Sequence, residues 1–467
     1  MTTINPGIFK SYDIRGIYPE EINEENIYAI TQAVYKVLQD GRNTNEPLKL
    51  VIGKDMRLSA PKLYPIFIQA LIDTGAELHD IDMVSTPTLY FAVSHYNYDG
   101  GIQLTASHNP SNYTGMKMVI NTPNGLIKIG KSTGMEEVKR YALENLVINS
   151  ETKGSITKKD GVLEDEVQNA IKIAKGTDVK PLKIVADPGN AMGAQYLDAL
   201  FQKLPCTLIR MNFELDGSFP VHQPDPMQPQ NLADLKKRVI EENADLGLAP
   251  DGDGDRLFVI DEKGEIVPAS IITALVAREL LKDNPGATIL YDIRYTNTAK
   301  KIIEEFGGKS DITKVGHAFI TEKMTQTGAI FGGESSGHYF FKETGNAEAQ
   351  MPMILMILNV LSRESKPISE VAKELRRSFE SGEINFVTSN SEQILDLLKQ
   401  TYNDGTLVTI DGTSVNFPDW RFGVRSSNTE PLLRLNVEAD TEELMKQKRD
   451  ELILFLQNEG AKLVEGH

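Results

Sequence analysis

The chain contains almost no cysteine, because Cys206 is the single one among 467 residues. One thiol excludes an internal disulfide and a zinc site built from cysteines, and it fits a reducing compartment. Long apolar runs are missing as well. The most apolar stretch, residues 351–361, is interrupted by Pro352 and Asn359 and is far too short to span a bilayer. The start of the chain lacks the basic and apolar regions of a signal peptide. We therefore expect a cytoplasmic protein that does not enter a membrane.

The chain has fewer basic residues than acidic ones. Lysine and arginine number 49 against 66 aspartates and glutamates, which gives a formal net charge of −17. Nucleic acid and anionic membrane surfaces would repel such a chain, so we expect it to bind neither. An anionic small molecule would have to be captured by a local cluster of arginine and lysine.

Strands and helices alternate along the chain in three successive blocks, which is the pattern of α/β layers. The polar stretch 149–165 separates the first block from the second. Beyond residue 375 the pattern changes to short strands and one long helix near 441–457, which indicates a smaller α+β unit. The predicted domains are residues 1–155, 156–262, 263–375 and 376–467.

A hydroxyl nucleophile lies in the segment Thr105-Ala-Ser-His-Asn-Pro110. Ser107 follows a predicted strand, and Asn109-Pro110 ends that strand. A serine at a strand exit is exposed to chemistry, so it can accept a phosphoryl group or attack one. Alone, such a segment is an ordinary turn.

Three carboxylates alternate with glycine in Asp251-Gly-Asp-Gly-Asp-Arg256. Hard oxygen ligands at this spacing suit a divalent cation such as Mg²⁺, and such a metal suits phosphoryl chemistry on a hydroxyl. A calcium-binding EF-hand is excluded because Arg256 occupies the position of the obligatory glycine and a strand follows. The remaining alternative is a plain acidic turn.

Two further loops carry groups that bind sugars and phosphates. Gly332-Gly-Glu-Ser-Ser-Gly-His338 follows a strand and offers a carboxylate for adjacent sugar hydroxyls. Arg425-Ser-Ser-Asn-Thr-Glu-Pro431 offers a guanidinium, hydroxyls and backbone amides, which is the composition of a phosphate-binding loop.

Together these four loops, in this order, resemble those of the α-D-phosphohexomutases, most closely the bacterial phosphomannomutase/phosphoglucomutase branch. The resemblance extends to Tyr12-Asp-Ile-Arg-Gly16, to Lys117 in Gly115-Met-Lys-Met118 and to Lys314-Val-Gly-His317. It covers nearly the whole chain. It implies three similar α/β domains with mixed sheets and a smaller C-terminal α+β domain, with the four loops meeting in a central cleft.

The resemblance also implies an activity. A phosphoryl group would move reversibly between the 1- and 6-positions of mannose or glucose phosphate, through a phosphoserine and a hexose 1,6-bisphosphate that also acts as activator. Ser107 is implied as the phosphoserine, and Asp251, Asp253 and Asp255 as ligands of one Mg²⁺ together with a phosphoserine oxygen.

The remaining implied residues fall into two groups. The further catalytic residues are Lys117, Arg256 and His317, and the acceptor of the hydroxyl proton stays open between Lys117 and His317. The implied substrate-binding residues are Tyr12, Arg15, Arg294, Glu334, Ser336, His338, Arg425, Ser427, Asn428 and Thr429.

One departure from the family pattern follows the sugar loop, where Gly345-Asn-Ala-Glu348 replaces a common Asp-Gly pair. We expect Asn346 to cap the next helix instead.

Three alternatives stay open. A phosphoglucosamine mutase would carry glutamine in place of Ser335. A phosphatase with a nucleophilic aspartate leaves Ser107 unexplained, and so does a non-catalytic sugar-phosphate binding protein. The sequence leaves the oligomeric state open between a monomer and a homodimer, and it does not identify the preferred hexose.

Overall fold

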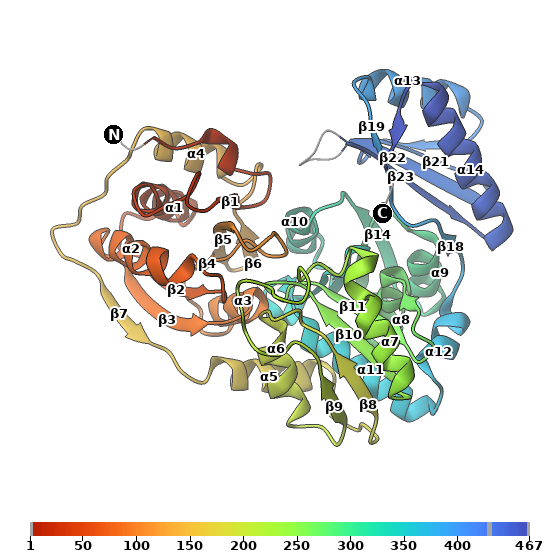
Figure 1. The fold of residues 1–467 in the computed structure, drawn as a ribbon, viewed down its shortest axis with the longest axis horizontal. Helices are drawn as coiled ribbons and strands as arrows, with labels where there is room; N and C mark the ends of the chain where they lie inside the picture. Colours follow the sequence, from red (N-terminus) through yellow and green to blue (C-terminus); the bar gives the residue numbers. More distant parts are fainter. Residues whose placement is uncertain (1–2, 427–431, 465–467) are drawn as a thin grey trace.

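The computed structural model describes residues 3–426 and 432–464, which form four lobes around a common centre (Figure 1). Within these residues the strands make four sheets, of seven, five, five and seven strands in chain order. Each sheet with its helices is one domain, so the predicted four-domain α/β architecture is confirmed. None of the helices in this part of the chain has the length and apolar character that crossing a membrane requires.

The first domain contains a mixed sheet with strand order β1-β5-β4-β2-β3-β7, and β6 extends it beside β5. Its elements are β1 (Ile14–Ile17), α1 (Ile27–Gly41), β2 (Lys49–Lys54), α2 (Ala60–Asp73), β3 (Glu77–Met83), α3 (Thr86–His95), β4 (Gly100–Leu104), β5 (Tyr113–Thr122), β6 (Gly125–Lys128), α4 (Met135–Leu143) and β7 (Ser155–Lys158). Helix α1 buries Ile27, Ile30, Val34 and Leu38, a spacing of three and four residues that places them on one face.

The second and third domains each contain a five-stranded sheet. The second comprises α5 (Val162–Ile173), β8 (Lys183–Ala186), α6 (Gly193–Phe201), β9 (Thr207–Arg210), α7 (Ala233–Glu241), β10 (Leu246–Pro250), β11 (Leu257–Asp261) and β12 (Ile266–Val267). The third comprises α8 (Ala269–Leu281), β13 (Thr288–Asp292), α9 (Asn297–Glu305), β14 (Lys309–Thr313), α10 (His317–Thr327), β15 (Phe331–Gly333), β16 (Tyr339–Phe341), β17 (Ala347–Glu348), α11 (Gln350–Glu364) and α12 (Ile368–Leu375). The two domains share one hydrophobic core, which includes Leu197 of α6 and Ile354 of α11.

The fourth domain has a seven-stranded antiparallel sheet and a core of its own. Its elements are β18 (Phe379–Glu380), β19 (Ile384–Val387), α13 (Ser391–Thr401), β20 (Thr406–Val408), β21 (Thr413–Asn416), β22 (Trp420–Ser426), β23 (Leu432–Ala439), α14 (Glu442–Asn458) and β24 (Lys462–Leu463). In Figure 1 it forms the blue lobe at the upper right.

The first three sheets place one hairpin loop in the same topological position. In each sheet a strand with a parallel neighbour turns into an antiparallel partner: β4 into β5, β10 into β11, and β15 into β16. The serine, carboxylate and sugar loops occupy these three turns. They therefore lie at the carboxyl ends of the parallel strands, where α/β sheets present ligand-binding groups.

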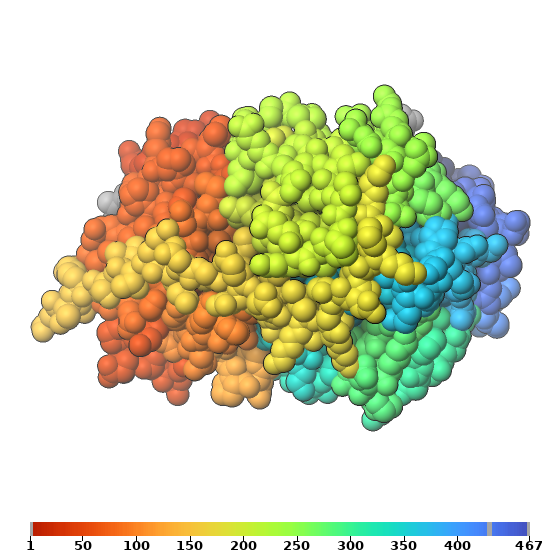
Figure 2. Space-filling model, turned by 90° about the horizontal axis from the view of Figure 1, so that it is seen from below, coloured from red at the N-terminus to blue at the C-terminus, as the bar shows by residue number. Residues whose placement is uncertain are grey.

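The polar stretch 149–165 contains β7, which is paired with β3, and the start of α5. Figure 2 shows this yellow segment running along the outside of the molecule from the first domain to the second. One expectation from the sequence was wrong, because Asn346 does not cap the following helix. Helix α11 begins after Ala349 without a side-chain cap, while Asn346 has φ 63° and donates to Asn124 of the first domain.

Candidate active site

Ser107 has a strained backbone. Its φ of 51° lies in the left-handed region, which a residue with a Cβ adopts at a cost of order 1–3 kcal/mol. The conformation is held because the Ser107 amide donates to Thr105 Oγ1 at 3.0 Å. The residue is only 1% exposed. Strain of this kind concentrates at functional sites, where surrounding contacts over-determine the backbone.

Arg57 supplies most of those contacts, and the sequence interpretation missed it. Its guanidinium is buried and pairs with Asp55 just after β2. It donates to four carbonyls of the serine loop, at 2.7–3.0 Å, which belong to Ser107, Asn109, Pro110 and Tyr113. A planar fork with five donors suits such multiple contacts. The Asp55-Met-Arg57 triplet at a strand end was the available signal.

The three carboxylates of the second-domain loop are buried together. Oxygen atoms of Asp251, Asp253 and Asp255 all lie within 4.8 Å of one another. The flanking elements are β10 and β11, an antiparallel pair, so the exclusion of an EF-hand is confirmed. Burial, and then repulsion by Asp255 and Asp253, raises the pKa of Asp251 to about 8.

These carboxylates fit a metal ion. Asp253 Oδ1 is buried and has no hydrogen-bond partner among the described residues, which leaves a lone pair for a ligand. A divalent cation prefers oxygen donors of this type and would relieve the mutual repulsion. The acidic group is therefore suited to a metal cofactor.

Lys117 lies beside the same group. Its ammonium is 2.6 Å from Asp253 and also pairs with Asp255. Burial alone would lower the pKa of Lys117, but Asp253 and Asp255 outweigh that effect and raise it. In this arrangement Lys117 is a cation.

The serine and carboxylate loops meet directly, although they belong to different domains. Ser107 Oγ donates to Asp251 Oδ2 at 3.2 Å, and His108 Nδ1 lies 3.2 Å from the same hydroxyl. Thr86, at the start of α3, donates to Asp253 at 2.5 Å. The predicted nucleophile and the predicted metal ligands are thus brought together.

The sugar loop contributes a rigid hydrogen-bonded set. Glu334 accepts from the Gly316 amide at 2.7 Å, and its other oxygen lies 2.8 Å from His338 Nδ1 and 3.3 Å from Ser336 Oγ. Arg294 donates to Ser336 at 3.2 Å. The side chains of these four predicted substrate-binding residues are buried and form one cluster.

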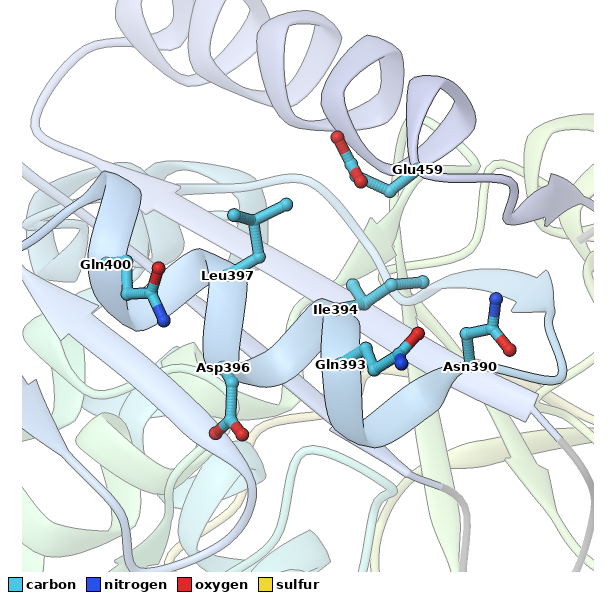
Figure 3. Close-up of a pocket in the computed structure, with 7 residues that line it drawn as sticks. All are labelled: Asn390, Gln393, Ile394, Asp396, Leu397, Gln400 and Glu459. Atoms are coloured by element: carbon cyan, nitrogen blue, oxygen red, sulfur yellow. The ribbon is translucent and has the colours of Figure 1, made fainter.

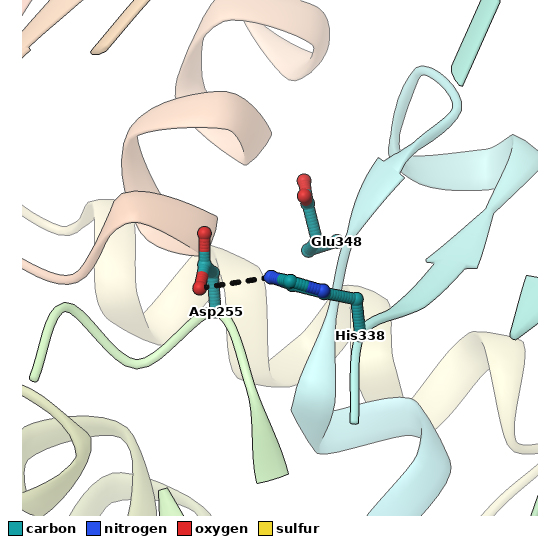
Figure 4. A group of neighbouring side chains, drawn as sticks. All are labelled: Asp255, His338 and Glu348. Carbon is teal, nitrogen blue, oxygen red and sulfur yellow. Dashed lines mark ion pairs between the residues drawn. The ribbon is translucent and has the colours of Figure 1, made fainter. Parts of the chain in front are cut away.

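His338 links the sugar loop to the carboxylate loop. Its ring points toward Asp255, with Nε2 3.3 Å from Oδ1, and Glu348 lies above the ring in this view (Figure 4). Burial lowers the pKa of His338, but Asp255 and Glu334 outweigh that effect and raise it to about 9.

The remaining predicted residues of the first and third domains surround this centre. The Tyr12 ring lies edge-on to His317, with ring centroids 5.4 Å apart, and its hydroxyl donates to Val315. Arg15 pairs with Asp13 at 2.7 Å and donates to Asn109 of the serine loop.

Arg256, in the carboxylate loop, has weaker contacts. Its amide donates to Asp251 at 3.1 Å, whereas its guanidinium Nε is 4.0 Å from the nearest Asp251 oxygen. Its Nη1 lies 2.9 Å from Met227 Sδ. The guanidinium charge is thus only partly compensated.

Arg425 lies near the end of β22 in the fourth domain and is buried. It donates to Glu383 at 2.7 Å, while its Nε has no hydrogen-bond partner in the described chain. The predicted residues Ser427, Asn428 and Thr429 lie outside the described residues.

A surface depression of about 390 Å³ lies elsewhere in the fourth domain (Figure 3). Its lining residues are Asn390, Gln393, Ile394, Asp396, Leu397, Gln400 and Glu459. This lining contains two carboxylates and no basic group, so it is unsuited to a phosphate. The depression is therefore not part of the candidate active site.

Comparison with known proteins agrees with this geometry. Residues 6–139, 164–264, 268–379 and 359–454 match, in that order, phosphoglucomutase/phosphomannomutase alpha/beta/alpha domains I, II and III and the C-terminal domain. A phosphomannomutase of Escherichia coli is 35% identical over 462 residues, which cover 96% of this chain and 98% of that protein.

Two further relatives point the same way. A phosphomannomutase/phosphoglucomutase of Pseudomonas aeruginosa is 35% identical over 454 residues, covering 95% of this chain and 94% of its own. A solved phosphoglucomutase/phosphomannomutase family protein of Burkholderia thailandensis superposes with a TM-score of 0.87 at 31% identity, covering 99% of this chain and 100% of its own.

Fold, site and matches together define an α-D-phosphohexomutase, an enzyme that transfers phosphoryl groups on hexose phosphates. Within that class, the chain belongs to the phosphoglucomutase/phosphomannomutase family.

Proposed function

We propose that this enzyme moves a phosphoryl group reversibly between the 1- and 6-positions of glucose or mannose phosphate, with Ser107 as the phosphoryl carrier. The observation that carries the proposal is the meeting of Ser107 Oγ, on a strained loop, with the Asp251 carboxylate at 3.2 Å. A hydroxyl presented to a cation-binding group is the arrangement that phosphoryl transfer requires.

A carrier solves a geometric problem. One fixed group cannot reach both ends of a hexose in a single attack, so two transfers are needed. In the first, the bond between phosphorus and Ser107 Oγ breaks, a free sugar hydroxyl bonds to phosphorus, and the hydroxyl proton ends on Ser107. The resulting hexose 1,6-bisphosphate turns in the site, and Ser107 takes the other phosphoryl group by the reverse chemistry.

Asp251, Asp253 and Asp255 would hold Mg²⁺ together with a phosphoserine oxygen. The bound cation supplies charge neutralisation on the transferring group. Lys117, paired with Asp253 and Asp255, adds a fixed positive charge in the same place. A phosphoserine brings about −1.5 to −2 charges, which these cations offset.

Arg256 and the sugar loop would orient the substrate. The partly compensated guanidinium of Arg256 is available to an anionic group. Glu334 would accept hydrogen bonds from sugar hydroxyls, and Ser336 would donate to or accept from them, beside His338. The walls of the substrate site would be completed by Tyr12, Arg15, Arg294 and His317.

The fourth domain would hold the phosphate that does not react. Arg425 brings a buried Nε with no partner in the described residues, which makes this donor available to an anionic group. Ser427, Asn428 and Thr429 would add hydroxyl and amide donors. Because the bisphosphate reverses, this loop must accept a phosphate from either end of the sugar.

Intact-mass measurement tests the carrier. The protein is incubated with glucose 1,6-bisphosphate, freed of ligand and weighed, and the modified peptide is fragmented. We expect one stable phosphoryl group on Ser107, retained in Ser111→Ala from the same loop and absent from Ser107→Ala. An unmodified wild-type protein, or a label at another residue, would overturn the assignment.

Hexose 1,6-bisphosphate is also the expected activator. It would rephosphorylate enzyme that has lost its phosphoryl group, so turnover of dephosphorylated protein should begin only after a lag unless the bisphosphate is added. The same assay separates the alternatives, because a phosphatase releases inorganic phosphate and a binding protein turns nothing over.

A further inference from the structure

A buried ion pair joins the first and third domains beside the site. Lys128 ends β6, and Glu348 ends β17, 220 residues further along the chain. Both side chains are buried, and the Lys128 ammonium donates to Glu348 Oε1. Around the pair, the hairpin of β5 and β6 packs on the third domain, where Asn346 donates to the Asn124 carbonyl at 3.0 Å. Removing one member of a buried pair leaves an uncompensated charge, so both members are needed together.

The Lys128 ammonium has a second polar contact. Its Nζ lies 3.0 Å from His317 Nδ1. The ring centroids of Tyr90 and Phe340 lie 5.2 and 5.0 Å from the same nitrogen, so aromatic rings contact the part of the ammonium that faces neither Glu348 nor His317. Lys128 is thus fixed among an anion, an imidazole nitrogen and two aromatic rings.

This contact determines the tautomer of His317. An ammonium has three donors and no acceptor, so Nδ1 has to be the acceptor and carry no proton. The ring is then a neutral imidazole with its proton on Nε2. Within the described residues Nε2 makes no hydrogen bond, and the side chain is 11% exposed, so a ligand can reach it.

The other charged and titratable groups near the ring do not reverse this assignment. Glu348 Oε1 lies 3.4 Å from Nδ1, farther than Lys128, and it is already bonded to the ammonium. A proton on Nδ1 would face the ammonium at 3.0 Å. Burial, followed by the charge of Lys128, lowers the pKa of His317, while the hydrogen bond and the charge of Glu348 act in the opposite direction without reversing the shift. The remaining neighbours are the ring of Tyr12, edge-on, and the ring of His338, stacked at 5.8 Å.

We propose that Lys128, held by Glu348, is a positioning residue that fixes His317 as a neutral imidazole with its proton on Nε2, so that His317 is a hydrogen-bond donor to an oxygen of the sugar phosphate. The inference rests on the proposed function for the identity of the ligand. It removes His317 from the candidate proton acceptors, because both ring nitrogens are committed.

Histidine nitrogen shifts test the tautomer without any assay of activity. Wild-type protein labelled with ¹⁵N in its seven histidines is compared with His317→Gln to assign the signals. We expect His317 with an unprotonated Nδ1 and a protonated Nε2 from pH 6 to pH 8. A proton on Nδ1, or an imidazolium over that range, would overturn the proposal, whatever the variants do.

Three variants separate positioning from mere domain contact. Lys128→Met removes the donor and keeps the length of the side chain, and Glu348→Gln removes its charge partner. Asn346→Gly removes a hydrogen bond of the same domain interface without touching His317. We expect Lys128→Met and Glu348→Gln to change the His317 signals. Both should also raise KM about tenfold, because the substrate loses one oriented hydrogen bond. Asn346→Gly should leave the His317 signals unchanged. Equal effects of all three would show that Lys128 serves only the interface.

Conservative replacement of His317 gives an independent measurement. The side-chain amide nitrogen of glutamine matches the position of imidazole Nε2, and that of asparagine matches Nδ1. We expect His317→Gln to keep about tenfold more kcat/KM than His317→Asn. The reverse order would contradict the proposal. These outcomes are distinct from failure of the proposed function, which is judged from the phosphoryl group on Ser107.

Discussion

A Cβ atom on Gly252 would lie 2.3 Å from the carbonyl oxygen of Ser107, so the serine and carboxylate loops are in backbone contact. No side chain mediates this approach. Because Arg57 also donates to the same Ser107 carbonyl at 2.7 Å, the position of the serine loop is fixed by a second contact. The distance between the nucleophile and the carboxylates is thus set by a glycine.

Gly252→Ala should therefore separate the two loops while each keeps its own fold. We expect turnover to fall at least about hundredfold, because misplacement by about 1 Å carries a cost of that order. Thermal melting should change far less than turnover. Gly286→Asn, at a position with φ 80° and open surroundings, is the control for a glycine replacement. Wild-type turnover in Gly252→Ala would contradict the role of this contact.

Ser107→Ala should abolish mutase turnover and leave folding nearly intact. The backbone contacts of Ser107 to Thr105 and Arg57 do not involve its hydroxyl. Turnover and thermal melting of both proteins are to be compared, with Ser111→Ala as the matched change. Turnover near the wild-type level would refute the phosphoserine.

The carboxylate loop should make activity depend on Mg²⁺. Asp253→Asn removes one charge from a group of three buried carboxylates, so we expect metal affinity to fall more than tenfold with only a small change in melting temperature. Titration calorimetry with Mg²⁺ measures the affinity, and Asp160→Asn, which replaces an exposed carboxylate, is the control. Full activity after chelation, with metal content shown to be zero, would rule out the assignment.

Glucose 1-phosphate and mannose 1-phosphate should have kcat/KM values within roughly tenfold, about 1.4 kcal/mol. The two sugars differ only at C2, which Glu334 and Ser336 need not contact, and a site discriminates weakly at a position that it does not read. Glucosamine 1-phosphate should be poorer, because its ammonium would approach His338, Lys117 and Arg256. A preference for glucosamine 1-phosphate, measured with bisphosphate present, would reassign the substrate and leave the serine chemistry standing.

Glu166, on α5, should make stability depend on pH. Burial raises the pKa of its carboxyl from 4.5 to about 7, although Thr88 donates to it and acts in the opposite direction. The folded state therefore keeps a proton that the unfolded state releases, so this contribution to stability is complete below pH 4.5 and is lost as pH rises to 7. The shift corresponds to about 3 kcal/mol.

Glu166→Gln should therefore gain stability relative to the wild type as pH rises through that window. Denaturant midpoints between pH 4 and pH 8 measure the effect, and Glu164→Gln, exposed on the same helix, is the control. Parallel pH curves for the wild type and Glu166→Gln would show that Glu166 does not titrate in this range.

Much of the fold was predictable because the buried strands are short apolar runs bounded by turn residues. Strands β2 and β8 lie within the short runs 48–54 and 182–187 of the sequence, and β10 overlaps the run 244–249. Helix α10 has a weak signal in the sequence, since its apolar residues are sparse and it begins after Gly316 without a side-chain cap. The site loops were found because each carries its chemistry in a few adjacent residues.

The supporting contacts were not predictable in the same way. Arg57 acts on a loop about 50 residues away, and Lys128 pairs with Glu348 across 220 residues. Local patterns contain no information on such partners. For Asn346 the local pattern gave a wrong prediction. Its residue type suits a helix cap, but in the folded chain its side chain donates to Asn124 and Thr325.

The core that the second and third domains share has a consequence for folding. Side chains from α6, α8 and α11 pack in one continuous cluster, whereas the fourth domain encloses its own. A chain cut between the second and third domains would expose apolar surface on both halves, so neither half is an independent folding unit. The carboxylate loop and the sugar loop are therefore expected to fold and unfold together in one cooperative step.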